Sequence, residues 1–440
     1  MPETINFTQH RRLTAQDYKT LWLATLGGCL EFYDFVVFVF FANIIGDRFF
    51  PPGIPEWVRQ LQTFGIFATG YLARPLGGVL MAHAGDLRGR KQVFTLSIFL
   101  MGLSTLGIGL LPTYADLGIW APLLLLLFRI LQGAAVGGEV PGAWVFVSEH
   151  VPQSRVGLAC GILTGGLTGG ILLGSLVATG INLEMSPAQC ASFGWRIPFL
   201  LGGVFGLLSM YLRRLLSETP VFQELKARRA LAAETPLKAV LRNHVTAIVF
   251  SGMLTWMLSA AIVVVILMTP ALLEKLYHVS VVAALQANSF ATIALIIGCV
   301  LAGWLTDRFG PSRVLLVGCP LLALIAYLFY TVMAVRPECL LPLYGLTGLW
   351  VGIVAVVPYV MTTAFPPAIR FTGMSFSYNL AYAIFGGLTP VVVTSLLPFD
   401  RLAPAHYVGA LCLIGFVTAT LLASGPARRY NSSLRKLDLV

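Results

Sequence analysis

The stretch LLLLLFRILQGAAVGGEVPGAW, residues 123–144, decides the fold class, because it is long and apolar yet contains Arg129, Gln132 and Glu139. About 20 apolar residues are enough for a helix to cross a bilayer. A charged side chain at the centre of the hydrocarbon costs about 3 kcal/mol, and such residues usually face the interior of a helix bundle or a water-filled path. The stretch therefore predicts a membrane helix whose polar side chains mark the route of an ion or a polar solute.

The composition extends this interpretation to the whole chain. Of the 440 residues, 57% are hydrophobic and only 11% are charged, whereas about 25% are charged in a typical soluble domain. The polar start of the chain is followed by an apolar run that is too long for a signal peptide and lacks a cleavage site. The sequence predicts an all-α polytopic membrane protein with twelve transmembrane helices near residues 20–43, 62–84, 92–111, 121–145, 157–181, 196–216, 245–271, 284–305, 314–334, 340–364, 372–397 and 406–424.

The positions of lysine and arginine predict the orientation, because these residues accumulate in short cytoplasmic loops. With the N-terminus inside, most of the 29 Lys and Arg residues fall in the termini and the inner loops. We therefore expect a multi-pass protein of a bacterial-type cytoplasmic (inner) membrane, with both termini in the cytoplasm. Topology explains the net charge of +10, so we expect no nucleic acid partner. The basic C-terminal tail is expected to lie on anionic membrane lipid.

Two pairs of similar loop sequences indicate an internal duplication. GDLRGRK follows the second expected helix and TDRFGPSR follows the eighth, which places Asp86 and Asp307 221 residues apart. PQSRVG follows the fourth helix and PAIRFTG follows the tenth, 215 residues later. We expect two pseudo-symmetric six-helix bundles with a pathway between them, an architecture in which one half rocks against the other. The expected divisions are 1–216 for the N-terminal bundle, 217–243 for a cytoplasmic linker, 244–425 for the C-terminal bundle and 426–440 for a cytoplasmic tail.

These motifs resemble those of a known family. GDLRGRK and RILQGAAVGG resemble signatures of the major facilitator superfamily, and the resemblance covers essentially the whole chain. EFYDF, LARPLGG, GWRIPF and SETPVF resemble the metabolite:proton symporter family within it, and AIFGGLTP resembles the citrate and tricarballylate members. The resemblance implies the major facilitator fold and secondary active transport. It also implies proton-coupled uptake of an organic acid such as citrate, 2-oxoglutarate or shikimate, or else of proline or betaine. We expect the protein to act as a monomer.

The charges of the N-terminal half predict a site for an anionic solute. Arg74 and Arg129 fall inside the second and fourth helices. A guanidinium binds a carboxylate through two parallel hydrogen bonds and keeps its charge. The C-terminal half has no comparable interior charges, so its neutral polar side chains would recognise the rest of the solute. The expected substrate-binding residues are Arg129, Arg74, Gln132, Tyr378, Asn379 and Tyr382.

Three interior carboxylates are candidates for carrying the coupling proton. Glu31 and Asp34 share one face of the first helix because they are three residues apart, and Glu139 lies about 15 Å from Arg129 along the fourth. Asp34 is the leading candidate. Its ionised form is expected to hold an arginine, which protonation would release for the substrate carboxylate. The alternative is a structural network, in which acids and arginines only fix the packing of the helices.

The inner loops are expected to form a gate. The resemblance implies that Asp86 caps the inner end of the eleventh helix in the closed state, and that Arg90 pairs with Glu149. An ion network of this kind exists in one conformation and breaks in the other. Ala364 occupies the repeat position of Glu149, so the second network is expected to be incomplete; alternatively, these charges only enforce topology. The expected gate residues are Asp86, Arg90, Lys91, Glu149, Arg155, Asp307 and Arg313.

Other classes of function find little support in the sequence. It has no P-loop, Gly-x-Ser-x-Gly, His-Glu-x-x-His or Cys-x-x-Cys motif, so we expect neither an enzyme nor a metal or cofactor beyond the coupling proton. A receptor with a transporter fold would need a signalling domain, and an exporter of hydrophobic cations would need unpaired interior acids. A zwitterion such as betaine remains the alternative substrate. Cys190 and Cys339 fall in expected outer loops, and the sequence leaves open whether they pair.

Overall fold

The computed structural model describes residues 13–88, 90–215, 219–227 and 236–424, and these residues form helices joined by short connections. In this part of the chain, nine helical segments are long and apolar enough to cross a membrane, and a bent pair, Pro187–Gly194 with Arg196–Leu212, adds a tenth. Two more helices complete the twelve that the sequence predicts: α3 (Glu56–Arg88) and α4 (Arg90–Leu110). Charged residues lie along α3, and the apolar part of α4 is the shorter stretch Thr95–Leu110.

The bounds of the helices follow the apolar runs closely. The other spans of the first half are α1 (Ala15–Phe40), α6 (Trp120–His150), α7 (Val156–Glu184) and α9 (Arg196–Arg214). The second half contains α12 (Val245–Ala260) continued by α13 (Thr269–Tyr277), α14 (Val281–Phe309), α15 (Pro311–Met333), α16 (Leu340–Val351) with α17 (Val356–Ala364), α18 (Arg370–Ala381) with α19 (Gly387–Leu396), and α20 (Ala403–Ala423). Short helices lie between spans: α2 (Ala42–Phe49), α5 (Tyr114–Leu117), α8 (Pro187–Gln189), α10 (Pro220–Ala227) and α11 (Pro236–Asn243).

Local sequence fixes where several helices begin. Thr14 starts α1 with a capping box: its side chain accepts a hydrogen bond from the backbone N–H of Asp17 (3.3 Å), and the Asp17 carboxylate accepts one from the backbone N–H of Thr14 (2.8 Å). Such reciprocal bonds satisfy backbone donors that a helix start would otherwise leave open. Ser280 caps α14 in a similar way, by accepting from the backbone N–H of Ala283.

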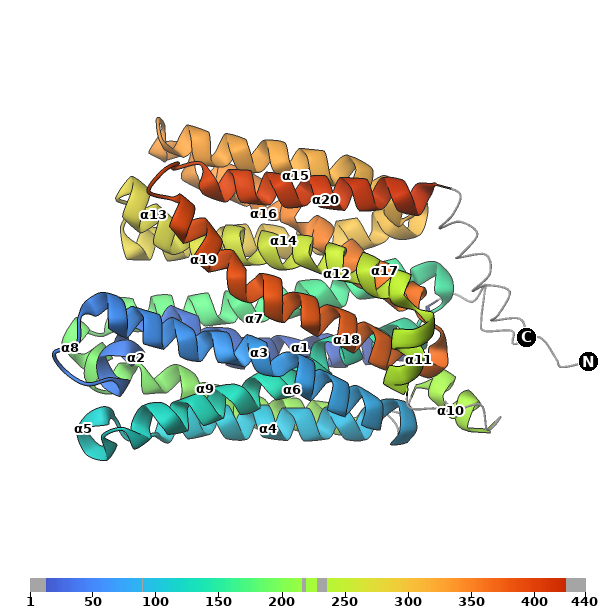
Figure 1. Ribbon diagram of the computed structural model, residues 1–440, viewed down its shortest axis with the longest axis horizontal. Helices are drawn as coiled ribbons and strands as arrows, with labels where there is room; N and C mark the ends of the chain where they lie inside the picture. The colour runs from blue at the N-terminus through green and yellow to red at the C-terminus, as the bar shows by residue number, and fades with distance from the viewer. Residues whose placement is uncertain (1–12, 89, 216–218, 228–235, 425–440) are drawn as a thin grey trace, which may run out of the picture.

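The two halves of the chain lie side by side (Figure 1). Helices α1 to α9 form one group and α12 to α20 form the other, and their main contacts are between α7 and α14 and between α3 and α18. We call the end of the bundle where α1 begins and α20 ends the terminal face. The short helices α5 and α8 lie at the opposite end, whereas α10 and α11 lie at the terminal face (Figure 1).

Glycines allow α7 and α14 to pack backbone against backbone. A Cβ on Gly303 would lie 2.4 Å from the carbonyl oxygen of Gly157, and one on Gly161 would lie 2.5 Å from that of Cys299. Small residues at four-residue intervals are typical of closely packed membrane helices. The interface between the halves is therefore tightest where these glycines lie.

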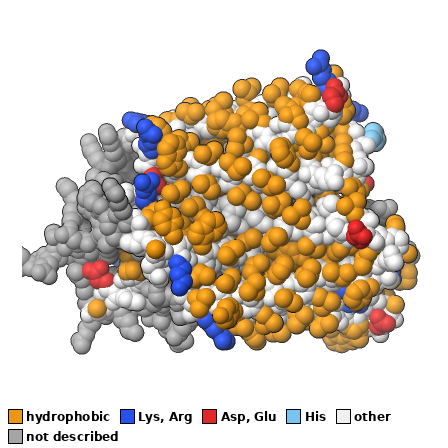
Figure 2. All heavy atoms as spheres, turned by 180° about the vertical axis from the view of Figure 1, so that it is seen from behind, with side chains coloured by type: hydrophobic (Ala, Val, Ile, Leu, Met, Phe, Trp, Pro, Cys, Tyr) orange, Lys and Arg blue, Asp and Glu red, His pale blue; other side chains and the backbone are white. Residues whose placement is uncertain are grey.

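The surface of the molecule fits a membrane environment. Figure 2 shows hydrophobic side chains across the middle of one face, with charged side chains gathered towards the two ends. A soluble protein rarely exposes apolar patches beyond a few hundred Å², so this band is the part that contacts lipid. Cys190 and Cys339 are free thiols in this structure.

Candidate functional site

The crossing of α3 and α6 positions both interior arginines. A Cβ on Gly133 would lie 1.9 Å from the carbonyl oxygen of Gly70, and one on Gly137 would lie 2.2 Å from that of Arg74. No side chain larger than hydrogen fits at these two positions of α6. The backbones of α3 and α6 therefore approach closely, and the side chains of Arg74 and Arg129 enter the interior of the bundle.

Arg129 is fully buried and has no acidic partner among the described residues. Its Nη1 donates to the side-chain oxygen of Gln132 (2.8 Å) and lies 3.3 Å from the carbonyl oxygen of Phe35. Its Nε and Nη2 have no hydrogen-bond partner. The rings of Phe35, Phe38 and Phe67 lie 4.6–5.1 Å from the guanidinium carbon, so cation–π contacts replace part of its lost hydration.

Arg74 lies at the interface between the halves and is also buried, with 1% of its surface exposed. Its Nε donates to Oδ1 of Asn379 (3.2 Å), a residue of α18. Its Nη2 has no partner. A buried donor without a partner is costly, so Arg74 offers an unused charged donor in the layer where the halves meet.

The guanidinium of Arg129 lies beside α3, the helix that carries Arg74. A Cβ on Gly70 would lie 3.2 Å from Nη2 of Arg129, and Gly70 is one helical turn from Arg74, or about 6 Å. Tyr71 lies on the same helix, with its ring 5.8 Å from the guanidinium carbon of Arg74. Arg129 thus reaches the stretch of α3 that carries Arg74, and the interior presents two cationic groups to a solute with more than one carboxylate.

The polar side chains of α18 cross to the first half. Asn379 donates through Nδ2 to the carbonyl oxygen of Gly137 (2.7 Å), and Ser375 donates to the same oxygen (3.2 Å). A Cβ on Gly78 would lie 2.4 Å from Nδ2 of Asn379. In this conformation Asn379 therefore connects the halves and holds Arg74 at the same time.

Aromatic rings surround the guanidinium of Arg74. Tyr382 and Tyr378 place their ring centres 4.4 and 5.2 Å from its central carbon. Tyr382 stacks on Tyr71 across the interface, with ring centres 5.5 Å apart, and Trp144 of α6 meets Tyr378 edge to face at 5.1 Å. Tyr382 begins a π-helical turn, Tyr382–Gly386, and such turns often occur at functional sites.

The carboxylates of α1 face away from the arginines. Ser209 of α9 donates to Oε1 of Glu31, and Asp34 packs against Gly202 of α9, where a Cβ would lie 2.4 Å from its Oδ1. Neither oxygen of Asp34 has a hydrogen-bond partner, because the hydroxyl of nearby Thr105 donates to the backbone. The ion pair expected between Asp34 and an arginine is therefore not formed in this conformation; α1 is rotated so that this face meets α4 and α9.

Gln132 connects the Asp34 region to Arg129. Its side-chain oxygen accepts from Arg129, and its Nε2 donates to Thr105 (2.8 Å) and lies 3.5 Å from the backbone oxygen of Asp34. A chain of polar contacts thus runs from Arg129 through Gln132 to the residue beside Asp34. Glu139 lies elsewhere on α6 and contacts α4, where Ser97 lies 3.5 Å from its Oε2.

The repeated aspartates make equivalent contacts at the terminal face. Oδ2 of Asp86 accepts from the backbone N–H (3.0 Å) and the hydroxyl (2.7 Å) of Thr372, in the first turn of α18. Asp307 accepts from the backbone N–H groups of Gly157 (2.7 Å) and Leu158 (2.8 Å), in the first turn of α7. Each half thus caps a helix of the other with an acid, which the positive end of a helix favours.

Glu149 forms a third contact across the terminal face. It pairs with Arg370 of the second half at 3.1 Å, and its carboxylate is buried. Arg370 occupies the repeat position of Arg155, which is exposed, as is Arg313. The pairing expected between Glu149 and Arg90 lies outside the described side chains, as does Lys91.

Several residues of this site are not among those that the sequence predicts. Tyr71 precedes Arg74 by three positions and so shares its helix face, which is a readable signal. Arg370 could have been found from the internal repeat, because it lies 215 residues after Arg155. Ser375 and Thr372 lie on the expected eleventh helix, but nothing in the sequence shows which face of it meets the first half. Trp144 lies on the expected fourth helix, and the sequence does not show which face of that helix meets the second half either.

Comparison with known proteins identifies the family. A family model described as Major Facilitator Superfamily matches residues 36–390. A putative proline/betaine transporter of Staphylococcus aureus (strain COL) is 35% identical over 92% of this chain and 88% of its own length. A citrate-proton symporter of Klebsiella pneumoniae is 31% identical over 90% of each chain, and a proline/betaine transporter of Salmonella typhimurium is 31% identical over 91% of this chain and 82% of its own.

Solved structures share the fold at low sequence identity. The proton:xylose symporter XylE of E. coli superimposes with a TM-score of 0.75 at 18% identity, over 92% of this chain and 95% of its own. The E. coli fucose:proton symporter FucP superimposes with a TM-score of 0.68 at 14% identity, over 93% of this chain and 99% of its own. The model match, the relatives and the twelve-helix architecture agree, and the chain belongs to the major facilitator superfamily of membrane transporters.

Proposed function

We propose that this protein takes up a small organic acid with two or three carboxylates, citrate-like in its chemistry, together with protons. In this proposal the terminal face is cytoplasmic, as the distribution of Lys and Arg favours. The protein would act as a monomer in a bacterial-type inner membrane. The solute would cross that membrane by alternating access, along a pathway that lies between the two halves.

The observation that carries the proposal is the pair of buried arginines. Arg74 and Arg129 lack acidic partners among the described residues and keep unused N–H donors. An unpaired buried charge is costly, so retaining two of them in a membrane interior needs a compensating partner. Two carboxylates of one substrate would supply it, each accepting hydrogen bonds from one guanidinium.

A zwitterion is the second candidate, and the aromatic rings favour it. Tyr71, Tyr378 and Tyr382 lie within 6 Å of the Arg74 guanidinium carbon, and stacked rings of this kind also attract a quaternary ammonium group. Arg74 would then bind the single carboxylate of a betaine-like solute. Two of the relatives bear the name proline/betaine transporter, whereas a third is named a citrate-proton symporter.

The proton would be carried by Asp34, with Glu31 beside it and Glu139 as a further candidate. The carboxylate of Asp34 is buried against α9 without a hydrogen bond, a site that accommodates the neutral form far better than the charged one. Because this carboxylate contacts neither arginine in the structure, its coupling to the substrate would be indirect. The Thr105–Gln132–Arg129 contacts provide the connection: ionisation of Asp34 would redirect the Thr105 hydroxyl and so loosen the hold of Gln132 on Arg129.

The contacts at the terminal face would act as the gate. They join the halves through Asp86, Asp307 and Glu149, while Asn379 joins them deeper in the bundle. In this proposal, the conformation with these contacts formed is the state closed towards the cytoplasm. Opening requires all of these bonds to break together, which makes the gate a two-state element.

Uptake into proteoliposomes tests the proposal. The purified protein would be reconstituted with an inward proton gradient and offered labelled citrate, 2-oxoglutarate, shikimate, proline and betaine. We expect accumulation of a di- or tricarboxylate, collapse by a protonophore, and loss in both R74A and R129A. Without an acidic partner to release, each variant should still fold, which a thermal unfolding profile would verify.

The outcomes separate the candidates. Accumulation of betaine or proline alone, dependent on Arg74 but not on Arg129, would replace the organic acid by a zwitterion. Accumulation that needs neither arginine would refute the site, and accumulation without any dependence on the proton gradient would refute the coupling.

A further inference from the structure

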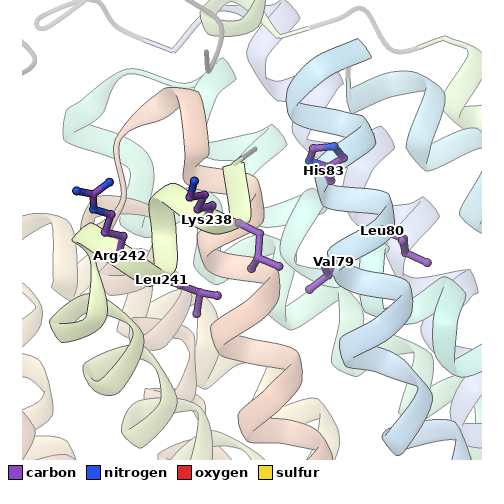
Figure 3. A pocket seen from close by; sticks show the side chains of 7 residues that line it. Val79, Leu80, His83, Lys238, Leu241 and Arg242 are labelled. Atoms are coloured by element: carbon purple, nitrogen blue, oxygen red, sulfur yellow. The ribbon is translucent and has the colours of Figure 1, made fainter. Parts of the chain in front are cut away.

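A pocket outside the transport site opens at the terminal face between α3 and α11, with a volume of about 650 Å³ (Figure 3). Val79, Leu80 and His83 of α3 form one wall, and four residues of α11 form the other: Leu237, Lys238, Leu241 and Arg242. None of these residues belongs to the substrate, proton or gate sets.

The pocket combines basic groups with apolar walls. Lys238 and Arg242 are four residues apart and therefore lie on one side of α11; both are exposed. No acidic residue in the described part of the chain pairs with them or with His83. Figure 3 shows His83 on one wall and Lys238 on the other, with Arg242 beyond Lys238 along α11 and with Val79 and Leu241 facing each other lower in the view. A ligand that satisfies both features has an anionic group and an apolar body.

The pocket lies at the edge of the lipid-facing surface. α11 leads directly into α12, which begins at Val245, 55% exposed. On the other wall, Leu72, Leu76 and Leu80 form an exposed stripe along α3, each at 64–69%. Apolar surface of this kind on a membrane helix meets acyl chains. A molecule whose head is in the pocket would therefore have its apolar part in the bilayer.

We infer that this pocket binds the head group of an anionic phospholipid from the same leaflet and that the bound lipid stabilises the closed terminal face. The basic groups match the charge of the phosphate, and the stripe on α3 matches the acyl chains. The occupant is a membrane lipid and not a soluble phosphate, because four of the seven lining residues are Val or Leu.

Its effect on conformation follows from the two walls. α3 belongs to the first half and holds the gate residue Asp86, whereas α11 contacts α18 and α12 of the second half. Separation of α3 from α18 would move the walls apart and divide the pocket. A ligand that binds one state better than another shifts the equilibrium towards that state, so the lipid opposes opening at the terminal face.

Lipid binding can be measured without any substrate. Native mass spectrometry of the full chain, in detergent with equal amounts of phosphatidylglycerol and phosphatidylcholine, would compare wild type, K238A/R242A and K275A/R336A. The last variant removes the same charge from exposed positions at the opposite end. We expect a preference of at least about tenfold for one phosphatidylglycerol in wild type and K275A/R336A, and none in K238A/R242A.

Two results would overturn the assignment. One is equal retention of phosphatidylglycerol by all three proteins. The other is displacement of the lipid by excess inorganic phosphate, which would show that a soluble anion is the ligand.

The conformational effect has a separate readout. Cys299 of α14 is buried under α7 at the interface between the halves, so its modification by a membrane-impermeant maleimide reports opening. In proteoliposomes, phosphatidylglycerol should slow this modification severalfold in wild type and leave K238A/R242A unchanged. Equal rates with and without phosphatidylglycerol in wild type would refute the stabilisation. Neither experiment depends on which solute is transported.

Discussion

Substitution of Asp307 by Asn tests the closed state of the terminal face with a change of one atom. The two oxygens of Asp307 each accept a different backbone N–H at the start of α7, from Gly157 at 2.7 Å and from Leu158 at 2.8 Å. An amide has only one acceptor oxygen. D307N must therefore lose one of these bonds and face the other N–H with a donor.

The size of the expected effect of D307N on the closed state follows from these contacts. A hydrogen bond to a charged group is worth about 1.5–3 kcal/mol net, and a carboxylate at a helix N-terminus adds about 0.3–1 kcal/mol. Asn keeps one neutral bond, so we expect the closed state to lose about 2 kcal/mol relative to the open one. Since 1.4 kcal/mol corresponds to a factor of ten, the open population should rise about 30-fold.

The rate at which Cys299 reacts with an impermeant maleimide measures that population, because α7 covers this thiol only while the halves are closed. Peptide mapping would separate its modification from that of the other cysteines. R308Q is the matched control: it changes the neighbouring residue, whose guanidinium lies over the rings of Trp304 and Phe309 instead of contacting α7. An unchanged rate in D307N, or an equal increase in R308Q, would refute the role of Asp307 in closure.

Three further predictions follow from the structure. G303A should favour the open state and slow uptake, because its Cβ would lie 2.4 Å from the carbonyl oxygen of Gly157, whereas G180A, with nothing within 4 Å, should behave as wild type in the maleimide and uptake assays. R370Q should raise the maleimide reactivity of Cys299, since it removes the ion pair that Arg370 makes with the buried carboxylate of Glu149 across the terminal face; reactivity equal to wild type would contradict this. The backbone N–H of Leu402 and then the side chain of His406 hold the pKa of Asp400 below its usual value. Asp400 thus stabilises the fold above the usual pKa of Asp and loses this effect as the pH falls through its lowered folded pKa. D400N should accordingly have a slightly lower unfolding temperature than wild type at neutral pH, and the two unfolding temperatures should converge at acidic pH. A gap between them that widens at acidic pH would contradict the stabilising role of ionised Asp400.

The helical framework could be predicted because the bilayer sets the length of its elements. Any apolar run of about 20 residues must satisfy its backbone hydrogen bonds as a helix, so twelve runs gave twelve spans. The repeat of Asp86 at Asp307 also identified two equivalent positions, and the structure shows both of them at the start of a helix of the other half.

The partners of the interior charges could not be predicted in the same way. Spacing placed Glu31 and Asp34 on one face of α1, but the neighbour of that face depends on the rotation of the helix, which lipid-facing and buried apolar residues specify only weakly. The expected pair of Asp34 with an arginine is not formed in this conformation: Asp34 lies against Gly202, and Glu31 accepts a hydrogen bond from Ser209, both residues of α9. Close approach of α3 and α6 depends on Gly133 and Gly137, whose role is visible only once the facing backbone is known.

The most direct test of the proposed transport cycle is proton movement driven by the solute alone. Proteoliposomes without an imposed gradient, in a lightly buffered medium, would receive the transported organic acid while the external pH is recorded. Wild type and the control E184Q, which changes an exposed acid at the end of α7, should make the medium more alkaline as protons enter with the acid, and D34N, whose side chain mimics the protonated form, should abolish that change. Full alkalinisation by D34N, or none by wild type during measurable uptake, would contradict proton coupling through Asp34.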